Sequence, residues 1–196
     1  MFDKITNVLL VLICAYVAWQ VKGIVDNQPK PQKNEPKKVE VKVNPHWHTK
    51  GKGSKEVIIV SDYECPFCSK LLESEFYKIV DKASDEGKIR LTIADFPLGM
   101  HKNAKKAAII ASCSPEGTFW SVDSRLHGKF QSLESEVDFP CRSDNKWLDE
   151  EIAEWKKLGM QGTPTVIVGK ENDGVVTGLM TMGSPTGDFK KWVEAN

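Results

Sequence analysis

The sequence predicts an α/β fold in which helices cover both faces of a sheet. Residues 57–60 and 165–168 are short apolar runs rich in β-branched side chains, which is typical of buried strands. Residues 89–96 alternate between apolar and polar side chains, which indicates another strand. Stretches with apolar residues at helical spacing lie between these runs, so strands and helices alternate along the chain.

The first strand, residues 57–60, leads into a helix that begins at about Cys65 and ends at Gly87. One face of this helix is apolar, because its apolar residues recur at gaps of three and four. These residues are Phe67, Leu71, Leu72, Phe76, Ile79, Val80 and Ala83. After the second strand, helical patterns follow over residues 101–112, 118–130 and 145–158.

The C-terminal part predicts a hairpin and a last helix. Residues 165–168 and 175–182 are its strands, joined across Asn172-Asp173-Gly174, a turn sequence. Ser184 and Pro185 then suit the N-cap and the first position of a helix.

The N-terminal segment has a different composition. Residues 5–21 are mostly apolar and reach the lower length limit of a membrane-spanning helix. A cleaved signal peptide and a retained anchor are the two interpretations. Ala15 and Ala18 lie three apart, which does not fit the A-x-A spacing of a cleavage site. We therefore favour a retained membrane anchor within residues 1–25.

The flanking charges of this segment argue against a domain outside the cytoplasm. Lys4 and the terminal amine precede it, with Asp3 opposing their charge. The lysines that follow it are Lys22, Lys30, Lys33, Lys37 and Lys38. Because lysine and arginine accumulate on the cytoplasmic side, this pattern favours a cytoplasmic domain.

Residues 26–54 are rich in lysine and proline and poor in large apolar side chains, which predicts a flexible linker. His46 and His48 suggest a fragment of a metal site, but without a third ligand nearby we expect no metal. The rest of the 196-residue chain, residues 55–196, has the size of one domain. Lys and Arg number 27, as do Asp and Glu, so the charge gives no reason to expect a nucleic-acid partner.

The tetrapeptide Cys65-Pro66-Phe67-Cys68 lies where the first strand passes into the first helix. In the first turn of a helix, unpaired backbone N–H groups and the helix dipole favour a thiolate, so we expect a lowered pKa for Cys65. Pro66 suits this turn because its missing N–H is not needed there. Since the thiolate is the attacking species, we assign Cys65 as the nucleophile and Cys68 as the more buried resolving thiol.

Two other interpretations of the pair remain open. In the first, the pair is a structural disulfide. In the second, it is half of a zinc site that Cys113 and Cys141 complete. Zinc sites usually show a second close pair, which Cys113 and Cys141 do not form in the sequence. These two cysteines are either unpaired and buried or joined in a structural disulfide, and we favour the disulfide in an oxidising compartment.

A second element, Gly162-Thr163-Pro164-Thr165, stands directly before a strand. A cis bond between Thr163 and Pro164 would leave the Thr163 backbone open to pair with an extended substrate. Asp62 and Glu64 stand beside the motif. If they are ordinary surface acids, they need have no part in its chemistry. A carboxylate close to Cys65 would raise the pKa of that thiol, and Glu64 is also a candidate acceptor for the Cys68 proton.

From about residue 57 to its end, the chain resembles the DsbA-like branch of the thioredoxin superfamily. The segment from Ser61 to Cys68 carries the resemblance together with several shorter motifs. These are Asp95-Phe96-Pro97-Leu98, His101, Asn103-Ala104, Gly117, Phe119-Trp120 and Gly162-Thr163-Pro164-Thr165. The resemblance implies a thioredoxin fold with a helical insertion at about residues 100–158. It also implies an oxidase, isomerase or reductase that works outside the cytoplasm without a cofactor. For the location of the domain, we follow the resemblance rather than the flanking charges.

The leading hypothesis is therefore a thiol–disulfide oxidoreductase that is anchored in the inner or cell membrane, on its periplasmic side. It would exchange disulfides with unfolded or cysteine-containing exported proteins and be reoxidised by a quinone-linked membrane partner of the DsbB type. The alternatives are a reductase or isomerase fed by a membrane electron donor of the DsbD type, and a membrane-tethered, chaperone-like binding module.

Two departures from the family pattern sharpen this hypothesis. The most oxidising members carry His where this chain has Phe67, so we expect an intermediate redox potential. Thr163 resembles isomerase-type members, but those carry an N-terminal dimerisation domain, for which residues 26–54 are too short and too polar. We expect a monomer.

Overall fold

The computed structural model describes residues 12–23, 35–115, 117–127, 145–185, 187 and 189–194. The chain divides into two units, Met1–Asn34 and Glu35–Asn196. In the first unit, residues 12–23 are helical with exposed apolar side chains such as Leu12 and Trp19. The rest of the predicted anchor lies outside the described residues. Within the described part, no helix has both the length and the apolar character needed to cross a membrane.

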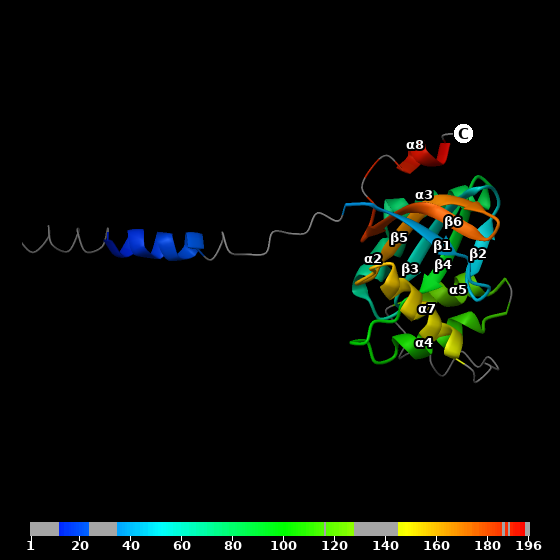
Figure 1. Ribbon diagram of the computed structural model, residues 1–196, viewed down its shortest axis with the longest axis horizontal. Coiled ribbons are helices and arrows are strands. Elements are labelled where there is room, and N and C mark those ends of the chain that lie inside the picture. Colours follow the sequence, from blue (N-terminus) through cyan, green and yellow to red (C-terminus); the bar gives the residue numbers. More distant parts are fainter. Residues whose placement is uncertain are drawn as a thin grey trace, which may run out of the picture. The chain divides into compact units, whose positions relative to one another are not determined.

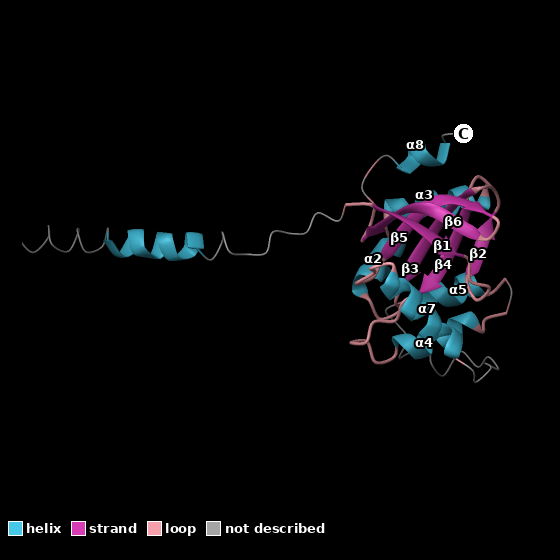
Figure 2. Ribbon diagram, viewed as in Figure 1, coloured by secondary structure: helices cyan, strands magenta, loops and turns pink. Residues whose placement is uncertain are grey.

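The second unit is built on one six-stranded sheet with the order β1-β6-β5-β3-β4-β2. The central strand β3 runs parallel to β4, and every other pairing in the sheet is antiparallel. In Figure 1 the colour of each strand gives its place along the chain, and Figure 2 shows the strands as one layer. The strands are β1 Lys37–Lys42, β2 His48–Gly51, β3 Lys55–Ser61, β4 Arg90–Asp95, β5 Thr165–Asn172 and β6 Val175–Met182.

Helices cover both faces of the sheet, as the sequence predicts. Val57 and Ile59 of β3 pack on one face with apolar residues of α3, α4 and α5. Ile58 and Val60 pack on the other face, where α7 contributes Trp155. The helices are α2 Pro66–Leu72, α3 Glu75–Asp85, α4 Ala104–Ser112, α5 Phe119–Leu126, α7 Lys146–Lys157 and α8 Phe189–Glu194. The helices α4, α5 and α7 lie together at one end of the sheet (Figure 2), as expected of a helical insertion between β4 and β5.

The predicted linker at residues 26–54 is wrong in its second half, because β1 and β2 lie there and form the two edges of the sheet. In β1, Val39 and Val41 are buried between exposed charged residues. This period of two is the pattern of a strand with one buried face. The lysine-rich composition concealed that alternation.

Two helix boundaries also differ from the prediction. The single helix expected up to Gly87 is divided into α2 and α3 by Ser74, whose hydroxyl accepts a hydrogen bond from the Tyr77 N–H at the start of α3. The last helix begins at Phe189 rather than at Pro185. Gly187 has φ +139°, which no right-handed helix accommodates, so the helix starts after it.

The hairpin of β5 and β6 is confirmed. Its turn places Asp173 and Gly174 at φ 50° and 77°. Positive φ at both central residues is the geometry that favours Asp-Gly in a two-residue hairpin loop.

Candidate functional site

The Cys65–Cys68 pair stands at the start of α2, directly after the turn that follows β3. Cys65 is the N-cap residue with an extended backbone, and Pro66 occupies the first turn of the helix. Both cysteines are buried, Cys65 at 3% and Cys68 at 1% exposure, and both thiols are free. Phe67 between them is 65% exposed. The motif thus combines two covered sulfurs with an apolar side chain open to solvent.

The two thiols have opposite electrostatic environments. A hydrogen bond from the Cys68 thiol is the main cause that lowers the pKa of Cys65 to about 5, and the backbone N–H groups of Phe67 and Cys68 lower it further. The same hydrogen bond, together with burial, raises the pKa of Cys68. Cys65 is therefore suited to be a thiolate, while Cys68 holds its proton.

The loop before β5 lies against this pair. The Thr163–Pro164 peptide bond is cis, and the Cys65 thiol lies 3.4 Å from the Thr163 carbonyl oxygen, to which it donates. The Thr163 side chain adds to the lowering of the pKa of Cys65 and opposes the rise in the pKa of Cys68. The two sequence elements that were singled out separately are thus brought into contact.

Asp62 ties the turn before Cys65 to the loop after β4. Its carboxylate accepts hydrogen bonds from the Glu64 N–H at 2.8 Å and from the Leu98 N–H at 2.7 Å. His101 Nδ1 lies 2.8 Å from the same carboxylate, which is fully buried. Asp62 is therefore not a surface acid, since it fixes the backbone on which the motif sits.

Glu64 contacts the start of α4. Its carboxylate accepts from the backbone N–H groups of Asn103 and Ala104 at 2.6 and 2.9 Å, and from the Asn103 side-chain amide at 3.1 Å. A carboxylate in this place satisfies unpaired N–H groups at a helix N-terminus. This position gives Glu64 a structural task that the sequence did not predict.

Sequence reasoning also missed a polar cluster behind Cys68. The Ser61 side chain opposes the rise in the pKa of Cys68, and its hydroxyl lies 3.4 Å from His127 Nε2. His127 Nε2 is 3.6 Å from an Asp123 carboxylate oxygen that also accepts from the Tyr63 hydroxyl at 3.1 Å. Ser61 and Tyr63 adjoin the motif in sequence, but His127 and Asp123 come from α5 and its end, and no pattern connects them with the cysteines.

The predicted pair of Cys113 and Cys141 is only partly described. Cys113 is disulfide-bonded, whereas Cys141 lies outside the described residues. Because Cys113 is engaged in a disulfide, it is not a ligand for the four-cysteine zinc site considered from the sequence.

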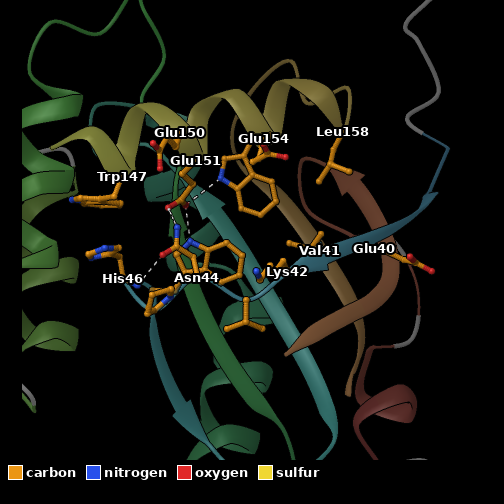
Figure 3. Close-up of a pocket in the computed structure, with 14 residues that line it drawn as sticks. Glu40, Val41, Lys42, Asn44, His46, Trp147, Glu150, Glu151, Glu154 and Leu158 are labelled. Carbon is orange, nitrogen blue, oxygen red and sulfur yellow. Dashed lines mark hydrogen bonds between the residues drawn. The ribbon is translucent and has the colours of Figure 1, made fainter. Parts of the chain in front are cut away.

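His46 and His48 lie against different aromatic rings: His46 stacks on Trp147 and His48 on Phe119. His46 borders a pocket of about 570 Å³ between α7 and the segment that joins β1 and β2. Figure 3 shows Glu151 pointing from α7 toward Asn44 in this pocket. The lining of the pocket includes none of the residues around the cysteine pair.

Comparisons with known proteins agree with this geometry. The family model described as Thioredoxin matches residues 42–174. A variant of Wolbachia pipientis α-DsbA1 superposes with a TM-score of 0.61 at 18% identity, over 79% of this chain and 92% of that chain. Pseudomonas aeruginosa DsbA2 gives 0.55 at 21% identity, over 75% and 90%. The catalytic domain of Proteus mirabilis ScsC gives 0.54 at 17% identity, over 76% and 88%. These structures have the same fold, which confirms the resemblance to DsbA-like proteins. No curated protein matches the sequence.

Proposed function

This chain belongs to the thioredoxin family of thiol–disulfide oxidoreductases, and we propose that its active dithiol is Cys65–Cys68. Cys65 is the nucleophile that forms a mixed disulfide with the substrate, and Cys68 resolves it. Thr163 and Pro164 support the substrate chain beside the reacting sulfur.

The observation that carries this proposal is the opposite character of the two thiols. Cys65 has a pKa of about 5, so it is a thiolate near neutral pH and both attacks and leaves readily. Cys68 has a raised pKa and is the more buried sulfur, so it stays protonated until the mixed disulfide has formed. A structural disulfide needs no such difference.

Exposed apolar side chains near the pair support a protein substrate. Phe67 is 65% and Met100 is 79% exposed, while Pro97 and Leu98 are half-buried. Because unfolded chains expose apolar residues, such a surface suits unfolded, cysteine-containing proteins, and we include exported proteins of this kind as substrates.

Location and partners follow as part of the same proposal. The periplasmic thioredoxin-like protein of Salmonella enterica serovar Typhimurium has this fold at 20% identity. By that analogy we place the domain on the extracytoplasmic side, with residues 5–21 as its anchor and a membrane redox partner. Protease added to intact cells should digest the domain, and digestion only after lysis would contradict this location.

The proposed function is tested by insulin reduction with dithiothreitol as reductant. Cys65→Ser should abolish the activity and Cys68→Ser should reduce it strongly, because each removes one sulfur of the exchange. Cys14→Ser is the matched control, since Cys14 is a free, exposed cysteine in the first unit. Full activity in Cys65→Ser would instead support a binding module.

A redox titration of the Cys65–Cys68 couple decides the direction of electron flow. We propose an oxidase with a potential between about −270 mV, the value of thioredoxin, and about −120 mV, the value of DsbA. A value at the thioredoxin end would replace the oxidase with a reductase that is fed by a membrane electron donor.

A further inference from the structure

The pocket of about 570 Å³ beside α7 is separate from the proposed dithiol, because its lining includes none of the residues around the cysteine pair. Its volume lies in the range of small-molecule sites in proteins, roughly 300–1,000 Å³. One wall is the face of α7 with Trp147 and Glu151, and the other is the end of β1 with Val41 and the segment that follows it (Figure 3). The side chains of these walls indicate which kind of small molecule fits.

Aromatic rings form much of the wall. Trp47 stacks on Trp155 with ring centroids 5.4 Å apart, and His46 stacks on Trp147 at 4.5 Å. Trp47 and Trp147 are half-buried, so each indole is packed by its partner and still borders the pocket. The face of an indole attracts cations, and aromatic rings recognise quaternary ammonium groups in this way.

The carboxyl group of Glu151 also borders the pocket, although Glu151 is only 4% exposed. In the described part of the chain, no cationic side chain is among the groups that shift its pKa, which burial raises to about 7. A cation in the pocket would stabilise the ionised form of Glu151. The groups that donate hydrogen bonds to it are uncharged: the Asn44 amide at 3.0 Å, the Trp47 and Trp155 indoles at 2.6 and 3.2 Å, and the Asp95 N–H at 3.3 Å.

The charge at the rim favours a cation as well. Glu40, Glu150 and Glu154 line the pocket and are exposed, and Lys42 opposes them with one ammonium group. Glu150 and Glu154 pair with lysines of α7 at 3.4 and 2.6 Å, but these lysines lie outside the lining and both pairs are exposed. Because exposed ion pairs are weak, both carboxylates can still interact with a cation in the pocket.

The hydrogen bonds of Glu151 narrow the class of cation. Its two oxygens already accept from four N–H groups, so they favour a ligand that brings charge without further donors. A primary ammonium group would need acceptors for three N–H donors. A quaternary ammonium group carries its charge under methyl groups, which suit the indole faces, and has no donor.

We propose that this pocket binds a small quaternary ammonium compound. Glu151 supplies the negative charge, and Trp47 and Trp147 supply the faces that the methyl groups contact. The carboxylates at the rim raise the local concentration of cations. This site is independent of the proposed function, so Cys65→Ser should bind the ligand as the parent protein does, and failure of one proposal leaves the other standing.

Choline and its neutral isostere 3,3-dimethylbutan-1-ol, in which carbon replaces nitrogen, test the need for charge. The full-length protein in dodecyl maltoside is titrated with each compound at constant ionic strength, and the indole N–H signals are followed by NMR. Choline should shift the signals of Trp47, Trp147 and Trp155 but not that of Trp120, which packs on Phe119 outside the pocket. It should bind about tenfold more tightly than the isostere, as a desolvated cation–π contact provides. Equal affinities, or an equal shift at Trp120, would overturn the proposal.

Two variants test the pocket residues. Trp147→Leu removes an aromatic face, and Glu151→Gln removes the charge but keeps the size of the side chain. Each should weaken choline binding roughly tenfold. The matched controls are Trp120→Leu, at another half-buried indole, and Asp149→Asn, at an acid of α7 that pairs with Lys105. If Glu151→Gln does not fold, Trp147→Leu decides alone, and unchanged affinity in that variant would overturn the site.

The pH dependence of binding tests Glu151 separately. Because its pKa is about 7, choline affinity should rise with pH through about 7 and then level off as Glu151 becomes charged. Glu151→Gln should abolish this rise, whereas His46→Gln should keep it. Loss of the rise in His46→Gln alone would overturn the role of Glu151. The other titratable groups at the pocket or beside Glu151 are Asp95, Glu40, Lys42, His46, Glu150 and Glu154.

A quaternary ammonium group occurs both in free compounds and in the headgroup of phosphatidylcholine. Glycerophosphocholine, the soluble form of that headgroup, distinguishes the two sources. We expect it to bind less tightly than choline, because the carboxylates at the rim repel its phosphate. Tighter binding of glycerophosphocholine would replace the free compound by a lipid headgroup as the ligand.

Discussion

At the scale of single residues, the two cysteines differ because of the groups that reach each sulfur. The Cys65 sulfur accepts a hydrogen bond from the Cys68 thiol and further ones from backbone N–H groups in the first turn of α2, which together lower its pKa. The same hydrogen bond and then burial raise the pKa of Cys68. One tetrapeptide thus provides an attacking and a resolving thiol.

This difference predicts the pH dependence of alkylation. In the reduced Cys14→Ser protein, reaction with iodoacetamide should reach half its maximal rate at about pH 5, because the pKa of Cys65 is lowered to about 5. The rate is measured by mass spectrometry of samples that are quenched at successive times. The Cys65→Ser variant should stay unreactive near neutral pH, since the remaining Cys68 holds its proton. A midpoint at the ordinary pKa of a thiol would contradict the assignment.

A second residue-scale prediction concerns Glu64. Glu64→Gln should lower the free energy of unfolding by about 1–2 kcal/mol, because it removes the charge that accepts the N–H groups of α4. Urea denaturation measures the loss. Glu73→Gln, at the end of α2, is the control. Equal losses in Glu64→Gln and Glu73→Gln would contradict this role of Glu64.

At the scale of elements, β1 and β2 are structural parts of the domain. The segment between them is held to α7 by Glu151, which accepts hydrogen bonds from the Asn44 side chain at 3.0 Å and from the Trp47 indole at 2.6 Å. Trp47 also stacks on Trp155 at 5.4 Å. These contacts explain why the second half of the predicted linker is part of the domain.

The domain boundary is therefore testable by truncation. A chain that begins at Glu35 should unfold cooperatively, whereas one that begins at Lys55 should not fold. The shorter chain loses Val39 and Val41, each contributing about 1.5–3 kcal/mol by burial, and leaves the edges of β4 and β6 unpaired. Thermal unfolding followed by circular dichroism measures the difference. Equal stability of the two chains would restore the boundary predicted from the sequence.

The elements also show what the sequence could and could not predict. β3, β4 and the hairpin were predictable because their apolar runs and the Asp173-Gly174 turn are local signals. The motif and the Thr163-Pro164 loop were predictable from residue types alone. The division at Ser74 depends on a single hydroxyl. The position of His127 beside Ser61 was beyond prediction, since it depends on how the insertion folds back onto β3.

At the scale of the whole molecule, buried acids couple folding to pH. Burial raises the pKa of Glu151 to about 7, and it also raises the pKa of Asp95, whose charge is repelled by Glu151. Glu151 in the folded protein thus keeps its proton up to about pH 7, whereas in the unfolded chain it loses it at about 4.5. Folding therefore takes up a proton between these values.

The free energy of unfolding should accordingly fall as pH rises from about 4.5 to about 7, by an amount on the order of 3 kcal/mol. The stabilising contribution is fully present below the unfolded pKa. Urea denaturation at a series of pH values measures the slope, which Glu151→Gln should flatten. Glu150→Gln is the matched control, since Glu150 is exposed on the same helix. If the slope of the free energy of unfolding against pH is unchanged in Glu151→Gln, another group causes it.

The whole account depends on Cys65 as the nucleophile and Cys68 as the resolving thiol. Trapping tests this assignment most directly. Full-length Cys14→Ser/Cys68→Ser protein is incubated with a disulfide-containing peptide, and the adduct is mapped by mass spectrometry without reductant. The account predicts that a stable mixed disulfide accumulates on Cys65, because the sulfur that would release it is absent. An adduct that also forms in Cys14→Ser/Cys65→Ser, or none on Cys65, would contradict it.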